Sequence, residues 1–241
     1  MNSPRPVALV TGAGERVGKV IALHLADIGY DVAVHYHKSE SGARDTSERC
    51  RSRGAKAPWF AADLSDPSGP QMLVERVVAA LGHIDALINS AAIMLRTPLE
   101  SVSPAQWDQI FAINLRAPFF ISLAASRAMP DGAAIVNIGD HLADEWWGQL
   151  VPHAISKAAV VPMTRHLARQ LAPRIRVNAI VPGAVMPPED WEEESQAEFA
   201  ASTALRRIGT PADVAGAVEY LLGATYVTGQ VLFVDGGRHL G

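Results

Sequence analysis

Short apolar runs alternate with longer segments of helical periodicity along the whole chain. The first run, residues 7–11, leads into a glycine-rich turn that begins at Gly12, and apolar residues spaced three and four apart follow over residues 17–28. The same order recurs, with predicted strands at residues 31–35, 57–61, 86–89, 135–138, 177–181 and 231–234. This alternation indicates crossover connections and an α/β fold, in which a parallel sheet of about seven strands carries helices on both faces.

The remaining predicted helices are a polar one at residues 40–53, one that begins at Asp66-Pro67, a long one from Ser103-Pro104 to about Met129, and one over residues 153–171 that Pro162 interrupts. Doubly wound folds of this order bind ligands at the carboxyl ends of their strands. We therefore predict a single dinucleotide-binding Rossmann domain over residues 1–241. Residues 187–198 carry six acidic side chains, which indicates either a solvated loop and helix start or part of a mobile substrate loop around residues 186–207.

Composition favours a globular protein of the cytoplasm. Hydrophobic residues make up 49% of the 241 residues and charged residues 19%, and the net charge of -4 gives no basic surface for nucleic acid. The single cysteine, Cys50, excludes an internal disulfide, suits a reducing compartment and is predicted to face solvent in a polar stretch. We see no signal peptide before the first strand, and no apolar run near the ~20 residues that a membrane helix needs.

The turn after the first strand reads Thr11-Gly12-Ala13-Gly14-Glu15-Arg16-Val17-Gly18. Glycines let the backbone turn sharply and approach a pyrophosphate, which then sits on the unpaired N–H groups of the following helix. Many tight turns contain glycines, but a turn between a first strand and a first helix predicts dinucleotide binding.

The end of the second strand decides between the two nicotinamide cofactors. Enzymes that use NAD usually place a carboxylate here, where it binds the ribose 2′-hydroxyl. In this chain His37, Lys38 and Ser39 follow the strand instead. Lys38 is either an ordinary exposed lysine or, with Ser39, His37 and Arg16, part of a site for the 2′-phosphate of NADP(H). The missing acid favours NADP(H).

Further motifs follow in order along the chain: Ala62-Asp63-Leu64, Asn89-Ser90-Ala91-Ala92, Pro182-Gly183-Ala184-Val185, and Tyr226-Val227-Thr228-Gly229-Gln230 with Val234-Asp235-Gly236-Gly237. Together with the glycine-rich turn, they make the chain resemble the short-chain dehydrogenase/reductase family over nearly its whole length. Residues 34–39, and Arg16 in place of the family's middle glycine, resemble pteridine reductases. The resemblance implies that the residues that bind NADP(H) are Gly12, Gly14, Arg16, Val17, Gly18, His37, Lys38, Ser39, Asp63, Leu64, Asn89, Ser90, Ala91, Lys157, Pro182, Gly183 and Val185.

The resemblance also implies a catalytic group of four residues. Asn114 matches the family asparagine that shapes a kink in the long helix, and Asp140 stands at the position of the family serine, as in pteridine reductases. Lys157 matches the lysine that binds the nicotinamide ribose, and His153, one helical turn earlier, stands at the position of the catalytic tyrosine. A histidine can donate a proton near neutral pH, but its ring reaches roughly 2 Å less far than a tyrosine hydroxyl. His153 is thus either a retained or altered acid, or a residue tolerated after catalysis was lost.

The substrate side resembles a pteridine reductase only in part. Arg16 and Asp140 match pterin-binding positions, whereas Met94 replaces the aromatic residue that would stack on the pterin ring. Trp146 and Trp147 form either a flat apolar wall of the pocket or a loop or subunit contact.

We therefore predict a cytoplasmic NADP(H)-dependent oxidoreductase that transfers hydride to a carbonyl or a ring C=N bond of a small molecule. The resemblance implies a homotetramer, and we expect no metal, nucleic acid or membrane partner. The alternatives are a cofactor-binding protein without dehydrogenase activity, and an NADP-sensing partner that recruits another protein through residues 187–198. The sequence does not name the substrate.

Overall fold

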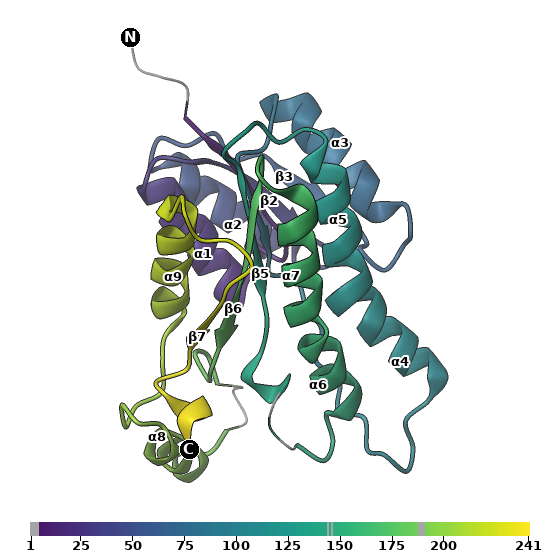
Figure 1. The fold of residues 1–241 in the computed structure, drawn as a ribbon, viewed down its shortest axis with the longest axis vertical. Coiled ribbons are helices and arrows are strands. Elements are labelled where there is room, and N and C mark those ends of the chain that lie inside the picture. Colours follow the sequence, from purple (N-terminus) through teal and green to yellow (C-terminus); the bar gives the residue numbers. More distant parts are fainter. Residues whose placement is uncertain (1–4, 144, 146, 188–190) are drawn as a thin grey trace.

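Seven strands form one sheet in the computed structural model, which describes residues 5–143, 145, 147–187 and 191–241 (Figure 1). The strand order is β3-β2-β1-β4-β5-β6-β7, and every neighbouring pair is parallel. The strands are β1 Val7–Val10, β2 Asp31–Tyr36, β3 Trp59–Ala61, β4 Ala86–Asn89, β5 Ala134–Ile138, β6 Arg176–Pro182 and β7 Val231–Val234. The predicted doubly wound fold is confirmed. Its strand order reverses between β1 and β4, which places the ligand crevice at the carboxyl ends of these strands.

Helices cover both faces of the sheet (Figure 1). One face carries α1 (Arg16–Asp27), α2 (Glu40–Arg51) and α9 (Pro211–Gly223), and the other carries α3 (Gly69–Leu81), α5 (Ala117–Ser126) and α7 (Val160–Leu171). The side chains of β1 pack on both faces of the sheet. Ala8 and Val10 pack on the face that carries α1, α2 and α9, and Leu9 packs on the face that carries α3, α5 and α7. Beyond α5 and α7, α4 (Pro104–Phe111) and α6 (Val151–Ala158) lie in contact with each other.

The long helix predicted from Ser103 begins as expected but is interrupted in the middle. Ser103 and Gln106 form a reciprocal capping box at the start of α4. A π-helical turn, Ala112–Arg116, then separates α4 from α5 and contains Asn114. Turns of this kind are frequent at functional sites.

The helical stretch Pro104–Ser126 corrects one sequence prediction. It is 23 residues long, and its most apolar window has a mean hydropathy of 1.2, so by length and composition it qualifies as a membrane span. However, 61% of that window is buried inside the molecule, where the stretch contacts α3, α6 and β4. Its apolar character is that of a core helix, which must be apolar on the faces that it buries.

Cys50 is buried, which corrects the prediction that it faces solvent. It lies on the inner face of α2 with Ala43, Thr46 and Ser47, and its Sγ lies 3.6 Å from the carbonyl oxygen of Ala22 in α1. These buried residues recur at helical spacing on one narrow face of α2. Because most other residues of α2 are charged or polar, the sequence pattern of this segment indicates an exposed helix. Burial raises the pKa of the Cys50 thiol to about 11, so the thiol stays protonated.

Three helical features differ from the sequence prediction. Helix α8 (Glu193–Ser202) was predicted only as a helix start, in one of the two interpretations of residues 187–198. Helix α9 was not predicted, although Thr210 and Asp213 form a capping box at its start. The helix predicted over residues 153–171 is two helices, α6 and α7, which meet at Ala159. Pro162 does not separate them, because it lies in the first turn of α7, where a missing N–H costs little.

Candidate active site

A cavity of about 1020 Å³ opens between the glycine-rich turn after β1 and the loop that joins β5 to α6. The predicted site residues that line it are Gly12, Gly14, Arg16, Val17, Gly18, His37, Lys38, Ser39, Leu64, Ser90, Ala91, Met94, Asp140, Trp147, His153, Lys157, Pro182, Gly183 and Val185. Asp63, Asn89 and Asn114 are adjacent to lining residues, and Trp146 lies outside the described residues. Asn89 is buried and donates to Ser122 and Asn137, so its side chain supports the sheet beneath the cavity.

The glycine-rich turn is shaped for close backbone approach. Gly12 has a φ of 66°, which side chains disfavour, and a Cβ there would lie 2.9 Å from the Cα of Ala91. A Cβ on Gly18 would lie 2.3 Å from the carbonyl oxygen of Gly12. The first turn of α1 therefore lies directly against the glycine-rich turn and beside the cavity, as a pyrophosphate site requires.

Arg16 has a left-handed backbone although it is not a glycine. Its φ is 51°, a conformation that costs an ordinary residue about 1–2 kcal/mol. Its guanidinium donates to the carbonyl oxygen of Met186 at 2.8 Å, in the loop after β6. Arg16 thus links the glycine-rich turn to the opposite side of the cavity, which supports a place beside both cofactor and substrate.

His35 in β2 holds this turn in position, a role that the sequence analysis missed. The backbone N–H of Gly12 donates to Nδ1 of His35 at 3.0 Å, and Nε2 donates to the carbonyl oxygen of Ala62 at 3.1 Å. Burial lowers the pKa of His35 to about 4. The neutral ring fits both partners, whereas a proton on Nδ1 would meet the N–H of Gly12 donor to donor.

We expect acid to weaken folding through His35. The unfolded chain takes up this proton first, because the folded pKa of about 4 lies below the usual ~6.5. The stability linked to neutral His35 is therefore complete above about pH 6.5 and is lost as the pH falls toward 4, with a loss of about 2 kcal/mol between about pH 7.5 and pH 5. Urea titrations measure this loss. His35→Asn, which keeps a donor and an acceptor but does not titrate, should lose about 2 kcal/mol less, and an equal loss in both proteins would contradict the expectation.

His37, Lys38 and Ser39 line the end of the cavity beside β2. The Nε2 of His37 lies 3.7 Å from the carboxylate of Asp63, which also accepts from the hydroxyl and the backbone N–H of Ser65 at 2.6 and 2.8 Å. The hydrogen bonds from Ser65, together with the charges of His37 and Lys38, lower the pKa of Asp63. Asp63 is thus bound to its neighbours. Within the described residues the side-chain ammonium of Lys38 has no hydrogen-bond or ion-pair partner, so it can bind an anion.

Asp140, His153 and Lys157 meet further along the same cavity. Asp140 follows the carboxyl end of β5, while His153 and Lys157 lie one turn apart on α6. Nε2 of His153 lies 3.1 Å from Oδ2 of Asp140, and the Lys157 ammonium donates to the carbonyl oxygen of Ile138 at 2.8 Å. Burial lowers the pKa of Lys157, and the Asp140 carboxylate opposes this shift.

Both ring nitrogens of His153 face oxygen acceptors. The residue is 2% exposed, its Nδ1 lies 3.0 Å from the carbonyl oxygen of Ile93, and its Nε2 faces Asp140. The Asn114 amide nitrogen lies 3.3 Å from Nδ1, but its two hydrogens are directed to Ile93 and Ser156, each at 3.0 Å. The protein itself thus supplies a hydrogen-bond partner to each ring nitrogen of His153.

Asp140 accepts hydrogen bonds from three groups. Burial alone would raise its pKa, but the donors His141 and His153 and the backbone N–H of Leu142 together lower it well below the usual range. Asp140 is therefore ionised and orients the His153 ring, and by itself it is a poor acid. The sequence analysis missed His141, whose Nδ1 lies 3.2 Å from Asp140 and whose buried Nε2 has no hydrogen-bond partner in the described part of the chain.

Trp147 and Trp191 both line the cavity. Their rings are 4° from parallel, with centroids 6.3 Å apart. This geometry supports the flat apolar wall predicted for Trp147. Trp191 was not singled out in the sequence, because it lies in the acidic stretch before α8. Met94, which is 51% exposed, also lines the cavity.

A family profile described as enoyl-(acyl carrier protein) reductase matches residues 12–239. The chain belongs to the short-chain dehydrogenase/reductase family. The 3-oxoacyl-(acyl-carrier-protein) reductase of Staphylococcus aureus (strain Mu50) is 31% identical over 240 residues, which cover 97% of this chain and 98% of that protein. This short-chain dehydrogenase/reductase is an NAD(P)-dependent oxidoreductase.

Two solved structures share the fold closely. A short-chain dehydrogenase from Burkholderia cenocepacia J2315, solved with NADP, is 33% identical with a TM-score of 0.92, and the match covers 99% of this chain and 100% of that one. A blue fluorescent protein from a metagenomic library, solved with NADPH, is 38% identical with a TM-score of 0.91, and the match covers 97% of each chain.

Proposed function

We propose that this short-chain dehydrogenase/reductase uses NADP(H) to transfer hydride to a carbonyl or to a ring C=N bond, as in pteridine-like substrates. One observation carries the proposal: the glycine-rich turn and Lys38 share a single cavity with Asp140, His153 and Lys157. The relatives solved with NADPH and NADP support the choice of cofactor. Residues 1–241 form one dinucleotide-binding domain of the cytoplasm in this proposal, and the loop around residues 186–207, of which residues 188–190 lie outside the described part, covers the substrate.

The cavity residues divide into those that hold the cofactor and those that handle the proton. NADP(H), when bound, supplies or accepts the hydride. The glycine-rich turn would hold its pyrophosphate, Lys38 and Ser39 its 2′-phosphate, and Lys157 its nicotinamide ribose. His153 holds a proton at Nε2, directed at Asp140. For His153 to act as the acid, the substrate atom must replace Oδ2 of Asp140 as the acceptor of that proton.

The engagement of His153 favours a second candidate, a cofactor-binding protein with impaired catalysis. Its ring is bonded at both nitrogens, to Asp140 and to Ile93, and is almost fully buried. The two candidates are separated by following NADPH oxidation with a panel of ketones, quinones and pterins. Turnover above the rate without substrate supports the reductase. Tight NADPH binding without turnover on any member of the panel supports the second candidate.

We expect NADPH to bind at least tenfold more tightly than NADH, a difference of about 1.4 kcal/mol. The reason is that Lys38 and Ser39 line the cavity where a 2′-phosphate would lie, and Lys38 is exposed and available. Calorimetric titration with both cofactors measures the two affinities. Lys38→Ala should narrow the gap by weakening NADPH alone. Equal affinities, or tighter NADH, would contradict the assignment.

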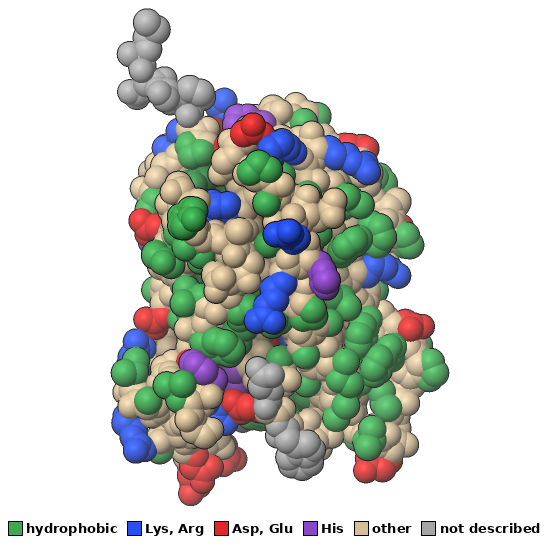
Figure 2. Space-filling view, viewed as in Figure 1, with side chains coloured by type: hydrophobic (Ala, Val, Ile, Leu, Met, Phe, Trp, Pro, Cys, Tyr) green, Lys and Arg blue, Asp and Glu red, His purple; other side chains and the backbone are tan. Residues whose placement is uncertain are grey.

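We also propose a homotetramer, with α4, α5, α6 and α7 in its interfaces. Apolar side chains gather over α4 and α6 in Figure 2, and Trp107, Phe119, Leu123 and Ile155 are each more than a third exposed. A groove of about 890 Å³ runs along this face, where Phe119 and Leu123 line it opposite α7. Light scattering should give about four times the 25.7 kDa chain mass, and Phe119→Asp should lower that mass. A monomer at micromolar concentration would overturn this proposal.

A further inference from the structure

The last helical turn of the chain reaches the substrate side of the cavity through one arginine. Arg238, in the 3-10 turn Arg238–Leu240, donates to both carboxylate oxygens of Glu145, at 2.6 and 2.7 Å. The two side chains are 20% and 25% exposed, so the ion pair is largely shielded from water. Two parallel N–H···O bonds also fix the orientation of both side chains.

Arg238 itself is anchored by the turn that precedes it. The carboxylate of Asp235 accepts from the backbone N–H groups of Gly237 and His239, each at 2.9 Å, and lies 2.7 Å from Nδ1 of His239. Gly236 and Gly237 have φ values of 68° and 79°, which a tight turn of this kind needs. Arg238 therefore extends from a fixed base.

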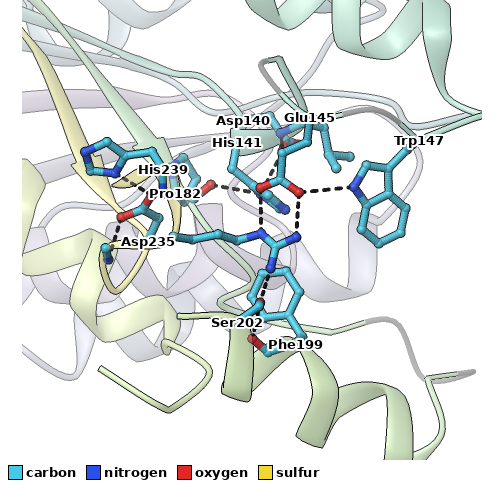
Figure 3. Close-up of polar contacts among 12 residues, drawn as sticks. Asp140, His141, Glu145, Trp147, Pro182, Phe199, Ser202, Asp235 and His239 are labelled. Carbon is cyan, nitrogen blue, oxygen red and sulfur yellow. Dashed lines mark hydrogen bonds and ion pairs between the residues drawn. The ribbon is translucent and has the colours of Figure 1, made fainter. Parts of the chain in front are cut away.

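Arg238 and Glu145 do not line the cavity, but each of them contacts an aromatic side chain. Glu145 accepts a hydrogen bond from the indole N–H of Trp147 at 3.4 Å. The guanidinium of Arg238 lies 4.3 Å from the ring centroid of Phe199 in α8, and it donates to the hydroxyl of Ser202. Figure 3 shows Trp147 beside Glu145, with Phe199 and Ser202 below them.

The two aromatic side chains that the ion pair contacts, Trp147 and Phe199, lie in or against the wall of the cavity. Phe199 is buried, and its ring lies 5.6 Å from that of Trp191, which is nearly parallel to Trp147. Trp147 and Trp191 line the cavity, whereas Arg238 and Glu145 stand outside its lining. The ion pair thus joins the β5–α6 loop, which carries Trp147, to the C-terminal turn. Through Arg238 this turn also contacts α8, whose Phe199 packs on Trp191 just before the helix.

We propose that Arg238 and Glu145 are positioning residues that hold Trp147 and Trp191 as a flat wall, and that this wall selects planar ring substrates. This inference rests on the reductase function proposed above. A planar ring stacks on a parallel indole face, while a small aliphatic carbonyl compound gains little from it. Loss of the ion pair should therefore weaken recognition of planar substrates and leave the proton-handling residues and the cofactor end unchanged.

The test compares Arg238→Ala and Glu145→Gln with Arg53→Ala as the matched control. Arg53 also forms an arginine–carboxylate ion pair, with Asp27 at 2.6 Å, but it follows the end of α2 and does not line the cavity. At saturating NADPH, each wall variant should raise KM for the planar probe 9,10-phenanthrenequinone by about tenfold. The KM for ethyl acetoacetate, kcat for both probes and the NADPH Kd should stay within about twofold. Arg238→Lys, which keeps the charge but not the planar fork, should fall between wild type and Arg238→Ala.

Two measurements on the NADPH-bound protein do not depend on turnover. Hydrogen exchange should increase in α8 and in residues 147–151 of the wall variants, but not in Arg53→Ala. Acrylamide should quench tryptophan fluorescence more strongly in Arg238→Ala, and a Trp147→Phe background should remove most of that increase.

The outcomes separate this inference from the proposed function. Unchanged exchange and quenching, or an equal rise in KM for both probes, would overturn the positioning role. If the wild type reduces neither probe and no member of the panel of ketones, quinones and pterins, the proposed function fails. In that case the Kd of phenanthrenequinone, read from tryptophan quenching, replaces KM: a tenfold loss confined to the wall variants supports the inference, and no loss overturns it.

Discussion

Replacing Asp140 by serine and His153 by tyrosine together is expected to raise kcat/KM for ketone reduction by about a hundredfold or more, since a well-placed general acid contributes ~10²–10⁴-fold. In the native chain these side chains satisfy each other at 3.1 Å, and an oxyanion forming beside them meets the ionised carboxylate of Asp140. The double variant removes that charge and offers two hydroxyl donors near Lys157. Steady-state NADPH oxidation with one ketone measures the gain.

The single variants are the matched controls for this prediction. His153→Tyr alone leaves the Asp140 carboxylate without its donor at Oδ2, so its gain should be smaller than that of the double variant. His153→Ala should lower any native turnover by about a hundredfold if His153 is the acid, while NADPH affinity is kept. A double variant that still binds NADPH but shows no gain would refute the idea that only this pair limits catalysis.

Gly18→Ala is expected to lower NADPH affinity by about a hundredfold, which corresponds to about 2.7 kcal/mol. The new Cβ would lie 2.3 Å from the carbonyl oxygen and 2.9 Å from the carbonyl carbon of Gly12, both backbone atoms that cannot move without displacing the turn. The start of α1 would therefore shift away from the position where it can meet a pyrophosphate. Calorimetric titration of the purified variant with NADPH tests this.

Gly216→Ala controls for the general effect of adding a methyl group to a helical glycine. Gly216 lies inside α9, and a Cβ there meets nothing within 4 Å. This variant should bind NADPH as the wild type does and should gain about 0.8–1 kcal/mol of folding stability, because alanine favours a helix interior more than glycine. Wild-type affinity in Gly18→Ala would show that the close approach of α1 to the turn does not shape the site.

Periodicity was enough to predict the sheet because its strands are short apolar runs between clear breaks. β4 and β7 have the predicted bounds, and β3, which was predicted to start at residue 57, begins at Trp59. The π-helical turn around Asn114 could be expected only through the family resemblance, since one inserted residue barely disturbs an apolar pattern. Helix α9 has a capping signal in its sequence, the pair Thr210 and Asp213, although the sequence prediction does not include this helix.

The candidate site was predictable where it depends on motifs, and less so where it depends on contacts between distant segments. The glycine-rich turn and Lys157 line the cavity as the resemblance implied. The second partner of His153 is the backbone carbonyl of Ile93, which no side-chain pattern reveals. Arg238 and Glu145 are 93 residues apart, and only the folded chain brings them together.

The hydrogen bonds of His35 limit how far the glycine-rich turn can be treated as a portable unit. Strand β2 holds the turn twice, because the His35 side chain accepts from the N–H of Gly12 and its backbone carbonyl accepts from the N–H of Ala13 at 2.8 Å. The same ring reaches Ala62 after β3. Transplanting residues 11–18 into another scaffold would thus carry the glycines but leave behind the histidine that sets their conformation. A working graft would need β1 and β2 together with β3 and the Ala62 that follows it.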